Sequence, residues 1–539
     1  MKTYIRFTLG LLGVGFLSAC DASPQVEQIR QSGFVYCGQA APSTFNPQLV
    51  DSGITAEALS PQIYDRLVTL NPVTHRPEPS LARDWQISNN GKTYTFYLRR
   101  DVQFQTTDWF TPNRPLRAQD VVFSFQRILN HDNDYHEVNG GHYPWFTGID
   151  FQNIVHSVTA LDAHTVQFEL NNANYAFLSD IATSHAVILS QEYAQQLAAR
   201  DEKNHIDRFP VGTGPFYLEH YKTGDWIRLK RNEAYWGEKA KMKQVVFDVS
   251  KRGTGTLAKL LRQECDVLNS PISSQIPIIE DNEKLQLTAT PAMNVAFVAI
   301  NTQRAVVNNP RVRHALNLAI NRQNILDSVY YGRGVRADTL LPPSSWAYRR
   351  DSITIRYDRN YALALLRDAN VKAGTQLTMF VPLEPRAYNP SPRKTAELIK
   401  SNLADIGIAL DIITDKEMQK PSREQLSHID LLLTGWIGDS GEPDNFLRPL
   451  LSCEGKIAGI NISHWCNEDF DVLLDLALET ERFRYRRNIY FQAQNIMNQD
   501  FPVIPLAHGM QYRVSDTSLQ GFINSPFNAQ PFNLVERVH

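Results

Sequence analysis

The sequence predicts an α/β protein of two lobes that are connected by two crossings of the chain. Three observations lead to this prediction. The chain of 539 residues is too long for a single hydrophobic core. Its first half mixes hairpins and helices without regular alternation, which is typical of an α+β region. From about residue 291 the pattern changes, and a compact βαβ unit follows between residues 377 and 413.

The composition is that of an ordinary globular protein, with 42% hydrophobic and 21% charged residues. The formal net charge of -3 provides no general attraction to a polyanion. Proteins that bind nucleic acid usually present a basic face. We therefore expect no nucleic-acid partner.

The N-terminus has the layout of an export signal. Two basic residues precede an apolar run over residues 7–17, and Cys20 follows in the order Leu-Ser-Ala-Cys, which is typical of a lipoprotein cleavage box. The run is shorter than the roughly twenty residues that a membrane-spanning helix needs. We expect residues 1–19 to be a signal peptide, Cys20 to be acylated and residues 20–32 to be a polar tether to the inner membrane. Cleavage without lipid attachment is the alternative.

Four cysteines remain in a compartment that is oxidising if the chain is exported. Four cysteines allow three pairings. We expect Cys453 to pair with Cys466, which is close in sequence, and Cys37 to pair with Cys265. A zinc site made by Cys453, His464 and Cys466 is the alternative, but it lacks a fourth ligand and the usual CxxC spacing.

The first lobe should begin with an apolar strand at residues 33–37. Turn-forming residues at 44–47 and 51–53 follow it and would place backbone N–H groups at the end of that strand. Apolar residues at helical spacing predict a helix over residues 58–68 that packs inward. Beyond it we expect two hairpins and a helix. These lie at residues 85–98, 158–170 and 118–129.

The second lobe should begin near residue 291 and end near Pro505. Two boundaries give the chain a first segment of lobe one at 33–290, lobe two at 291–505 and a return segment at 506–539. A cleft between two such lobes is a common place for a small ligand. The elements expected in lobe two are a strand at 294–301, a helix from Pro310, the strand 377–381, the helix 393–406, the strand 408–413 and a buried strand at 429–434.

The last of these strands is followed by Gly-Trp-Ile-Gly-Asp-Ser-Gly-Glu-Pro-Asp-Asn-Phe at residues 435–446. Its glycines and proline predict a loop that begins at Gly435. Loops at the carboxyl ends of strands hold ligands in open α/β sheets. A carboxylate at Asp439 and a guanidinium at Arg386 would suit the two charges of a zwitterionic peptide. The residues of the loop that we expect to contact the ligand are Trp436, Ile437, Gly438 and Asp439.

Several motifs have alternative interpretations as parts of an enzyme or of a cofactor site, and each lacks a required residue. Gly438–Gly441 matches the core of the trypsin-like nucleophile motif, but Glu442 replaces the next glycine and no Ala-Ala-His-Cys segment supplies a base. Glycines at 212–214 and 253–255 continue neither as a phosphate-binding lysine loop nor as a dinucleotide fingerprint. His136 and His142 lack helical metal spacing. We expect no enzyme, cofactor or metal site.

Several motifs occur in the order found in one family. The chain resembles the family 5 extracellular solute-binding proteins, which are the receptors of peptide-type ABC importers, from about residue 33 to the C-terminus. Finer details near residues 104–112 and 389–392 are most similar to the branch that serves the Sap transporter, associated with antimicrobial-peptide resistance and, in some bacteria, haem uptake. The motifs are Leu81–Arg99, Asp120–Phe125, Gly212–Phe216, Val312–Leu316 and Gly435–Phe446.

The resemblance implies a two-lobed periplasmic binding protein of type II, similar to cluster C, with an extra α+β subdomain in lobe one and a two-crossing hinge. It implies that Asp439 takes the ammonium of a peptide, that Arg386 takes its carboxylate and that the turn of Asp51, Ser52 and Gly53 also contacts it. The expected partners are a peptide and the permease subunits of an inner-membrane ABC transporter, with haem as the alternative ligand. We expect a monomer.

Overall fold

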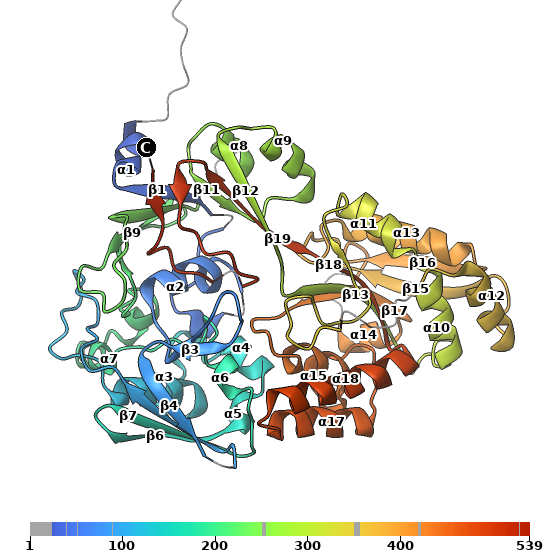
Figure 1. Ribbon diagram of the computed structural model, residues 1–539, viewed down its shortest axis with the longest axis horizontal. Coiled ribbons are helices and arrows are strands. Elements are labelled where there is room, and N and C mark those ends of the chain that lie inside the picture. The colour runs from blue at the N-terminus through green and yellow to red at the C-terminus, as the bar shows by residue number, and fades with distance from the viewer. Residues whose placement is uncertain are drawn as a thin grey trace, which may run out of the picture.

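The computed structural model describes residues 24–538 except 39, 51, 89, 251–254, 350–355, 419–421 and 528. The expected signal peptide, the acylation of Cys20 and the contact of Asp51 lie outside the described residues. Two large sheets with their own helices stand side by side (Figure 1). The α/β class and the two-lobed architecture are therefore confirmed. Within the described part of the chain, no helix is both long and apolar enough to cross a membrane.

Lobe one is built on a seven-stranded sheet in the order β12-β19-β11-β1-β10-β9-β8. Strand β1 (Gly33–Cys37) has the predicted bounds and is parallel to β10 and β11. Every residue of β1 is buried, as expected for an apolar run inside a sheet. The other strands are β8 (Phe216–Lys222), β9 (Trp226–Arg231), β10 (Gln244–Asp248), β11 (Val267–Asn269), β12 (Leu285–Pro291) and β19 (Met510–Asp516). The helices nearby are α1 (Pro24–Arg30), α8 (Thr256–Leu261) and α9 (Ile276–Glu280).

The α+β subdomain of lobe one contains a four-stranded antiparallel sheet, made of both predicted hairpins in the order β4-β5-β7-β6. Helix α3 spans Ala118–Leu129, as predicted, because its apolar residues recur at helical spacing and face the core. The strands are β4 (Ala82–Ile87), β5 (Thr93–Leu98), β6 (Val155–Asp162) and β7 (Thr165–Leu170), with the small pair β2 (Val68–Leu70) and β3 (Pro77–Pro79). The helices are α4 (Pro144–Gly148), α5 (Phe151–Ile154), α6 (Phe177–Asp180) and α7 (Gln191–Ala199).

The predicted helix over residues 58–68 is wrong in its second half. A π-helical turn at Thr55–Leu59 leads into α2 (Ser60–Ile63), and the chain then turns into β2. The carbonyl oxygen of Ile63 accepts hydrogen bonds from the Gly214 backbone N–H and the Gln105 side chain, both at 2.9 Å. In a longer helix this oxygen would bond to residue 67 instead. Tertiary hydrogen bonds therefore end the helix, although the apolar residues beyond it are buried as expected.

Lobe two is built on a six-stranded sheet in the order β14-β18-β13-β17-β15-β16. Successive residues of the fully buried β13 (Asn294–Ile300) join the apolar clusters on opposite faces of the sheet. Helices therefore cover both faces. The other strands are β14 (Val335–Arg336), β15 (Thr375–Val381), β16 (Ile408–Thr414), β17 (Leu431–Ile437) and β18 (Val503–His508). One face carries α10 (Pro310–Ala319), α11 (Arg322–Val329), α12 (Arg359–Asp368) and α13 (Pro392–Ala404), and the other carries α15 (Asp444–Leu451), α17 (Glu468–Glu479) and α18 (Phe483–Asp500).

The predicted βαβ unit is confirmed, since β15 and β16 are parallel and α13 connects them. The helix predicted from Pro310 ends at Ala319, where Asn321 caps the separate helix α11 by accepting from the Asn324 N–H. Two short helices complete the lobe, α14 (Arg423–Ser427) and α16 (Cys453–Ala458). The pair β20 (Leu519–Gln520) and β21 (Glu536–Arg537) lies in the last part of the chain.

The loop predicted to begin at Gly435 begins three residues later. Strand β17 continues to Ile437, which pairs with Asn294 of β13. Gly435 belongs to the strand because the ring of Tyr388 lies against it: a Cβ atom there would come within 2.2 Å of that ring. The glycine therefore serves a close approach and does not break the strand.

Two segments cross between the sheets side by side, from β12 to β13 and from β18 to β19. The backbone N–H of Gly509 donates to the side-chain oxygen of Asn294 at 2.7 Å, and Nδ1 of His508 donates to the Asn294 carbonyl at 2.8 Å. A Cβ atom on Gly509 would lie 2.2 Å from the Ala387 carbonyl oxygen. The crossings are therefore tied to each other, and the segment predicted to return from residue 506 crosses at Gly509.

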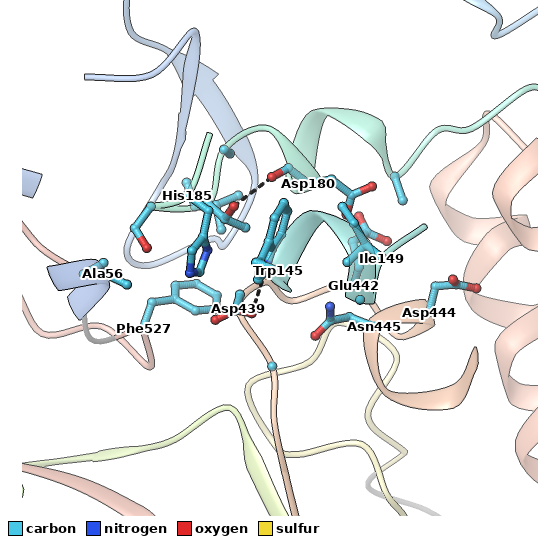
Figure 2. A pocket seen from close by; sticks show the side chains of 18 of the residues that line it. Ala56, Trp145, Ile149, Asp180, His185, Asp439, Glu442, Asp444, Asn445 and Phe527 are labelled. Carbon is cyan, nitrogen blue, oxygen red and sulfur yellow. Dashed lines mark hydrogen bonds between the residues drawn. The ribbon is translucent and has the colours of Figure 1, made fainter. Parts of the chain in front are cut away.

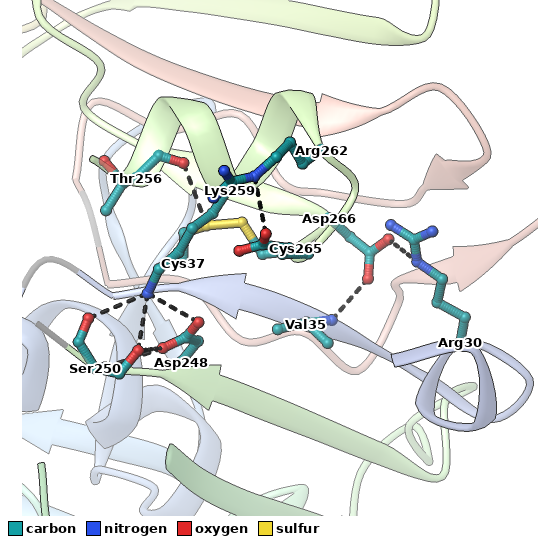
Figure 3. Close-up of a disulfide and its surroundings, with 11 residues drawn as sticks. Arg30, Val35, Cys37, Asp248, Ser250, Thr256, Lys259, Arg262, Cys265 and Asp266 are labelled. Atoms are coloured by element: carbon teal, nitrogen blue, oxygen red, sulfur yellow. Dashed lines mark hydrogen bonds and ion pairs between the residues drawn. A yellow bond between two sulfur atoms is a disulfide. The ribbon is translucent and has the colours of Figure 1, made fainter. Parts of the chain in front are cut away.

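Both predicted disulfides are confirmed, as Cys37–Cys265 and Cys453–Cys466. The first joins the end of β1 to the segment before β11 (Figure 3). Beside it, the buried carboxylate of Asp266 accepts from the Val35 backbone N–H at 2.8 Å and pairs with Arg30 at 2.8 Å. The cysteine pairing rules out the zinc site proposed for Cys453 and Cys466, because thiolates are needed for zinc.

Candidate ligand-binding site

A cavity of about 1060 Å³ lies between the lobes. Residues of lobe one, of lobe two and of the C-terminal part of the chain, at 526, 527 and 529–531, line it (Figure 2). Ligand sites in proteins commonly have volumes of about 300–1,000 Å³. The cavity is thus large enough for a small organic molecule or a short peptide.

Asp439 enters this cavity from the loop that follows β17. The loop is fixed at its start, because the Gly438 N–H donates to the Met293 carbonyl at 2.7 Å. A Cβ atom on Gly438 would come within 2.4 Å of the Phe446 ring, so a larger residue would displace the loop. The Asp439 carboxylate accepts a hydrogen bond of 2.8 Å from the indole N–H of Trp145 in lobe one (Figure 2).

Trp145 is a site residue that the sequence analysis missed. It lies on α4, which begins at Pro144, a residue suited to a first helical turn. Its ring is stacked on His185 with centroids 5.0 Å apart and an interplanar angle of 9°. The local signal was the aromatic sequence Tyr-Pro-Trp-Phe at 143–146, but nothing in that sequence pointed to a partner in the other lobe.

Glu442 makes a second connection between the lobes. One of its carboxylate oxygens accepts from the Ser179 hydroxyl of lobe one at 3.0 Å, and the other pairs with Arg486 of lobe two at 2.9 Å. Ser440, in the protease-like motif, is buried, and its hydroxyl accepts from the Glu442 backbone N–H at 3.4 Å. This serine therefore stabilises the conformation of the loop by a hydrogen bond within it.

Asp180 lies on the lobe-one wall beside this connection. Burial raises the pKa of Asp180 well above its ordinary value, and the charges of Glu442 and Asp444 raise it further. Carboxylates that are crowded together resist simultaneous ionisation. A cation placed among them would relieve this repulsion.

The wall of the cavity is strongly acidic. Of the described residues that line it, ten are acidic and two are arginines. The arginines are Arg66 and Arg448, and Arg448 already pairs with Asp444 at 2.8 Å. The acidic residues are Glu57, Asp65, Asp150, Asp180, Asp439, Glu442, Asp444, Glu454, Asp475 and Glu479.

The structure brings together most of the site residues expected from the sequence. Those that line the cavity are Ser52, Trp436, Ile437, Gly438 and Asp439. The indole N–H of Trp436 donates to the Asn445 carbonyl at 2.9 Å, which fixes the wall there. Gly53 and Arg386 are not among the lining residues. Arg386 is exposed on a tight turn and pairs with Glu384 at 2.6 Å, so its contact with a ligand stays a prediction.

Comparison with known proteins agrees with this architecture. Residues 76–457 match the family described as bacterial extracellular solute-binding proteins, family 5 Middle. The chain belongs to this family. The solute-binding protein is 44% identical over 540 residues to the probable ABC transporter periplasmic-binding protein SapA of Escherichia coli K12, covering 100% of this chain and 98% of the relative. This level of similarity confirms the expected Sap branch.

Two further relatives differ in what their names say they bind. Heme-binding protein A of Haemophilus influenzae is 35% identical over 525 residues, covering 96% of each chain. The crystal structure of a dipeptide-binding protein from Pseudoalteromonas sp. SM9913, in complex with Met-Leu, is 37% identical, with a TM-score of 0.80 over 94% of this solute-binding protein and 100% of that chain. The SapA relatives are periplasmic transport proteins, and membership of their family implies a periplasmic location.

Proposed function

We propose that this protein is the substrate-binding component of an ABC transporter, which captures peptides between its lobes and delivers them to an inner-membrane permease. The observation that carries this proposal is the Asp439 carboxylate, held in the interlobe cavity by Trp145. A carboxylate in a partly dry cleft is a natural partner for an ammonium group. The complex of the related dipeptide-binding protein with Met-Leu supports the same ligand class.

The arrangement in two lobes allows a ligand to change the conformation of the protein, from open to closed lobes. A peptide that contacts both lobes favours the closed state by its differential contacts. Backbone atoms of Gly438 on one wall and Ser52 on the other are suited to an extended peptide, whose main chain is the same whatever its side chains. Binding would then tolerate many sequences. The permease would distinguish loaded from empty protein by lobe closure.

The acidic wall favours peptides with positive charge. The acidic lining residues outnumber the arginines and attract a basic side chain as well as the terminal ammonium, even though burial raises the pKa of Glu57, Asp65, Asp180 and Glu454. Antimicrobial peptides that are basic fall into this class, in line with the Sap branch. Arg66 and Arg448 are the lining groups suited to a terminal carboxylate, and Arg386 would have to approach from its exposed turn to take that part.

Attachment at the membrane is a separate part of the proposal. The sequence Leu-Ser-Ala-Cys at residues 17–20 supports acylation of Cys20, after removal of residues 1–19. The tether expected to reach residue 32 is wrong in its second part, because Pro24–Arg30 form helix α1 and Arg30 pairs with the buried Asp266 of lobe one. The segment before α1 then tethers a monomer that has no catalytic activity. Boundaries near residues 291 and 509 divide its chain between the lobes, the second a few residues later than expected because β18 extends to His508 in the lobe-two sheet.

Haem is the second candidate, favoured by the similarity to heme-binding protein A. Haem carries two carboxylates of its own, which an acidic wall repels. The ten lining carboxylates therefore favour the peptide. Absorbance titration with haemin separates the two ligands, because a bound haem shifts the Soret band.

Mass spectrometry of ligand that co-purifies with the protein tests the proposal most directly. We expect a mixture of short peptides enriched in lysine and arginine. Calorimetry with a synthetic peptide from that mixture should then give a single site. Recovery of haem alone, or the absence of binding by any recovered peptide, would contradict the proposal.

A further inference from the structure

A cluster of metal-ligating side chains lies in lobe one, on the segment between α3 and α4. His131, His136 and Glu137 each offer one ligand atom, and these atoms all lie within 4.8 Å of one another. The sequence analysis considered His136 with His142, but the fold brings His131 to this position instead. The signal was missed because a loop, not a helix, provides the spacing.

His136 is oriented as metal-ligating histidines usually are. It is buried, and its Nδ1 lies 2.8 Å from the Arg127 carbonyl oxygen. A carbonyl only accepts, so Nδ1 carries a proton, and in the neutral ring Nε2 keeps its lone pair. Nε2 lies 3.7 Å from a carboxylate oxygen of Glu137. The hydrogen bond from Nδ1 to the Arg127 carbonyl fixes the tautomer and the orientation of the ring, as is usual for a histidine that binds a metal through its other nitrogen.

The distances are close to what a metal ion requires. Bonds of about 2.0–2.1 Å in tetrahedral geometry place two ligand atoms about 3.3 Å apart. The His136–Glu137 distance is only slightly longer. The ring of His131 lies 4.4 Å from that of His136, centroid to centroid, and its side chain is exposed, so a rotation can bring its nitrogen closer.

Hydrogen bonds from Arg127 and Tyr143 fix the backbone of the segment that carries the cluster. Arg127, paired with Asp207 at 2.7 Å, donates from Nε to the Tyr135 carbonyl at 3.0 Å. The Tyr143 hydroxyl donates to the His136 carbonyl at 2.9 Å. The Glu137 carboxylate lies close over Gly141, where a Cβ atom would come within 2.6 Å of it. His136 is therefore held in place before any ion arrives, whereas the Glu137 side chain is exposed.

We propose that His131, His136 and Glu137 form a site for a divalent transition-metal ion, with Zn²⁺ as the best match. Two imidazoles and one carboxylate are a common donor set for zinc, and three protein ligands leave a fourth position for water or a further ligand. None of these three residues lines the cavity between the lobes. The site is thus separate from the peptide-binding residues.

Competition with a chromophoric chelator, on protein freed of any purification tag, tests the site. We expect one equivalent of Zn²⁺ to bind and the melting temperature to rise with zinc. His131→Ala and Glu137→Gln should each weaken binding by about tenfold or more. Both side chains are exposed, so these variants should fold.

His156→Ala is the matched control, because His156 is exposed in the same lobe but outside the cluster. It should leave zinc affinity unchanged. A protein that shows no saturable zinc binding would overturn the proposal, as would binding that neither His131→Ala nor Glu137→Gln weakens. Because peptide affinity is not measured, either outcome leaves the proposed transport function untouched.

Discussion

The indole N–H of Trp145 in lobe one donates a hydrogen bond of 2.8 Å to the carboxylate of Asp439 in lobe two. A carboxylate has about four lone-pair positions, so it can accept this bond and an ammonium group together. The bond therefore orients Asp439 without preventing its use. It also contributes to closing the lobes.

Removing the charge of Asp439 should weaken the binding of peptides with a free N-terminus. Asp439→Asn keeps an oxygen that can accept from Trp145 but loses the ion pair with the ammonium. We expect affinity to fall by about ten- to a hundredfold, since hydrogen bonds to charged groups contribute about 1.5–3 kcal/mol. Isothermal titration calorimetry measures the change.

The matching control is the same peptide with its N-terminus acetylated. Its affinity for the unmodified protein should already be low, and Asp439→Asn should change it little. Equal losses for the free and the acetylated peptide would show that Asp439 does not bind the ammonium.

Loss of the Ser179–Glu442 hydrogen bond should open the empty protein. Ser179→Ala removes one bond between the lobes, worth about 1 kcal/mol, and should raise the open fraction about fivefold. Small-angle X-ray scattering would show a larger radius of gyration. Ser345→Ala is the control, because its hydroxyl bonds to the Gly441 carbonyl within lobe two. If both variants expand equally, the bond does not control closure.

His508 should make the protein sensitive to acid. Burial lowers the pKa of His508 to about 4, whereas an unfolded histidine has a pKa of about 6.5. Between these values only the unfolded chain binds the proton, so stability is lost as pH falls through this window. At pH 4.5 the loss from this group should be about 2.5 kcal/mol relative to pH 7.

Two variants test whether His508 is the group that causes the loss of stability in acid. His508→Asn keeps a donor for the Asn294 carbonyl but cannot be protonated, so the difference in unfolding free energy between pH 7 and pH 4.5 should shrink. His156→Asn, at an exposed histidine, should leave it unchanged. Urea unfolding at both pH values gives these free energies, and an unaltered difference in His508→Asn would contradict the assignment.

The two disulfides should differ in their contribution to stability. Cys37–Cys265 closes a separation of 228 residues and Cys453–Cys466 one of 13. By chain entropy alone they contribute up to about 5 and about 3 kcal/mol. Replacing each pair by serines and measuring urea unfolding should give the larger loss for the first. The reverse order would point to native contacts near Cys453 as the dominant effect.

Sequence patterns located the elements that have a clear apolar periodicity. Residues 33–37, helix 118–129 and the βαβ unit follow from periodicity, because each has one clear apolar pattern. The helix over 58–68 failed because hydrogen bonds to Ile63 come from residues far along the chain. Such partners leave no periodic signal.

The site was predicted more fully in lobe two than in lobe one, where only the turn at residues 51–53 was expected and Ser52 lines the cavity. Asp439 follows a strand and stands in a glycine-rich loop, so its place at a strand end could be inferred. Trp145 is 294 positions away in sequence, and only the packing of the two lobes brings its indole to that carboxylate. Likewise, Gly435 looked like the end of a strand because the approach of Tyr388 is a tertiary contact.

The paired crossings at Asn294 and Gly509 have a mechanical consequence. In Figure 1 the crossings lie near β19, between the two lobes, and helices α6 and α15 lie lower in the view. The two crossings therefore act as a short hinge about which the lobes rotate relative to each other. A small rotation about this hinge displaces the residues furthest from it the most. The surface at α6 and α15 is therefore where a partner protein would most easily detect that a ligand is bound.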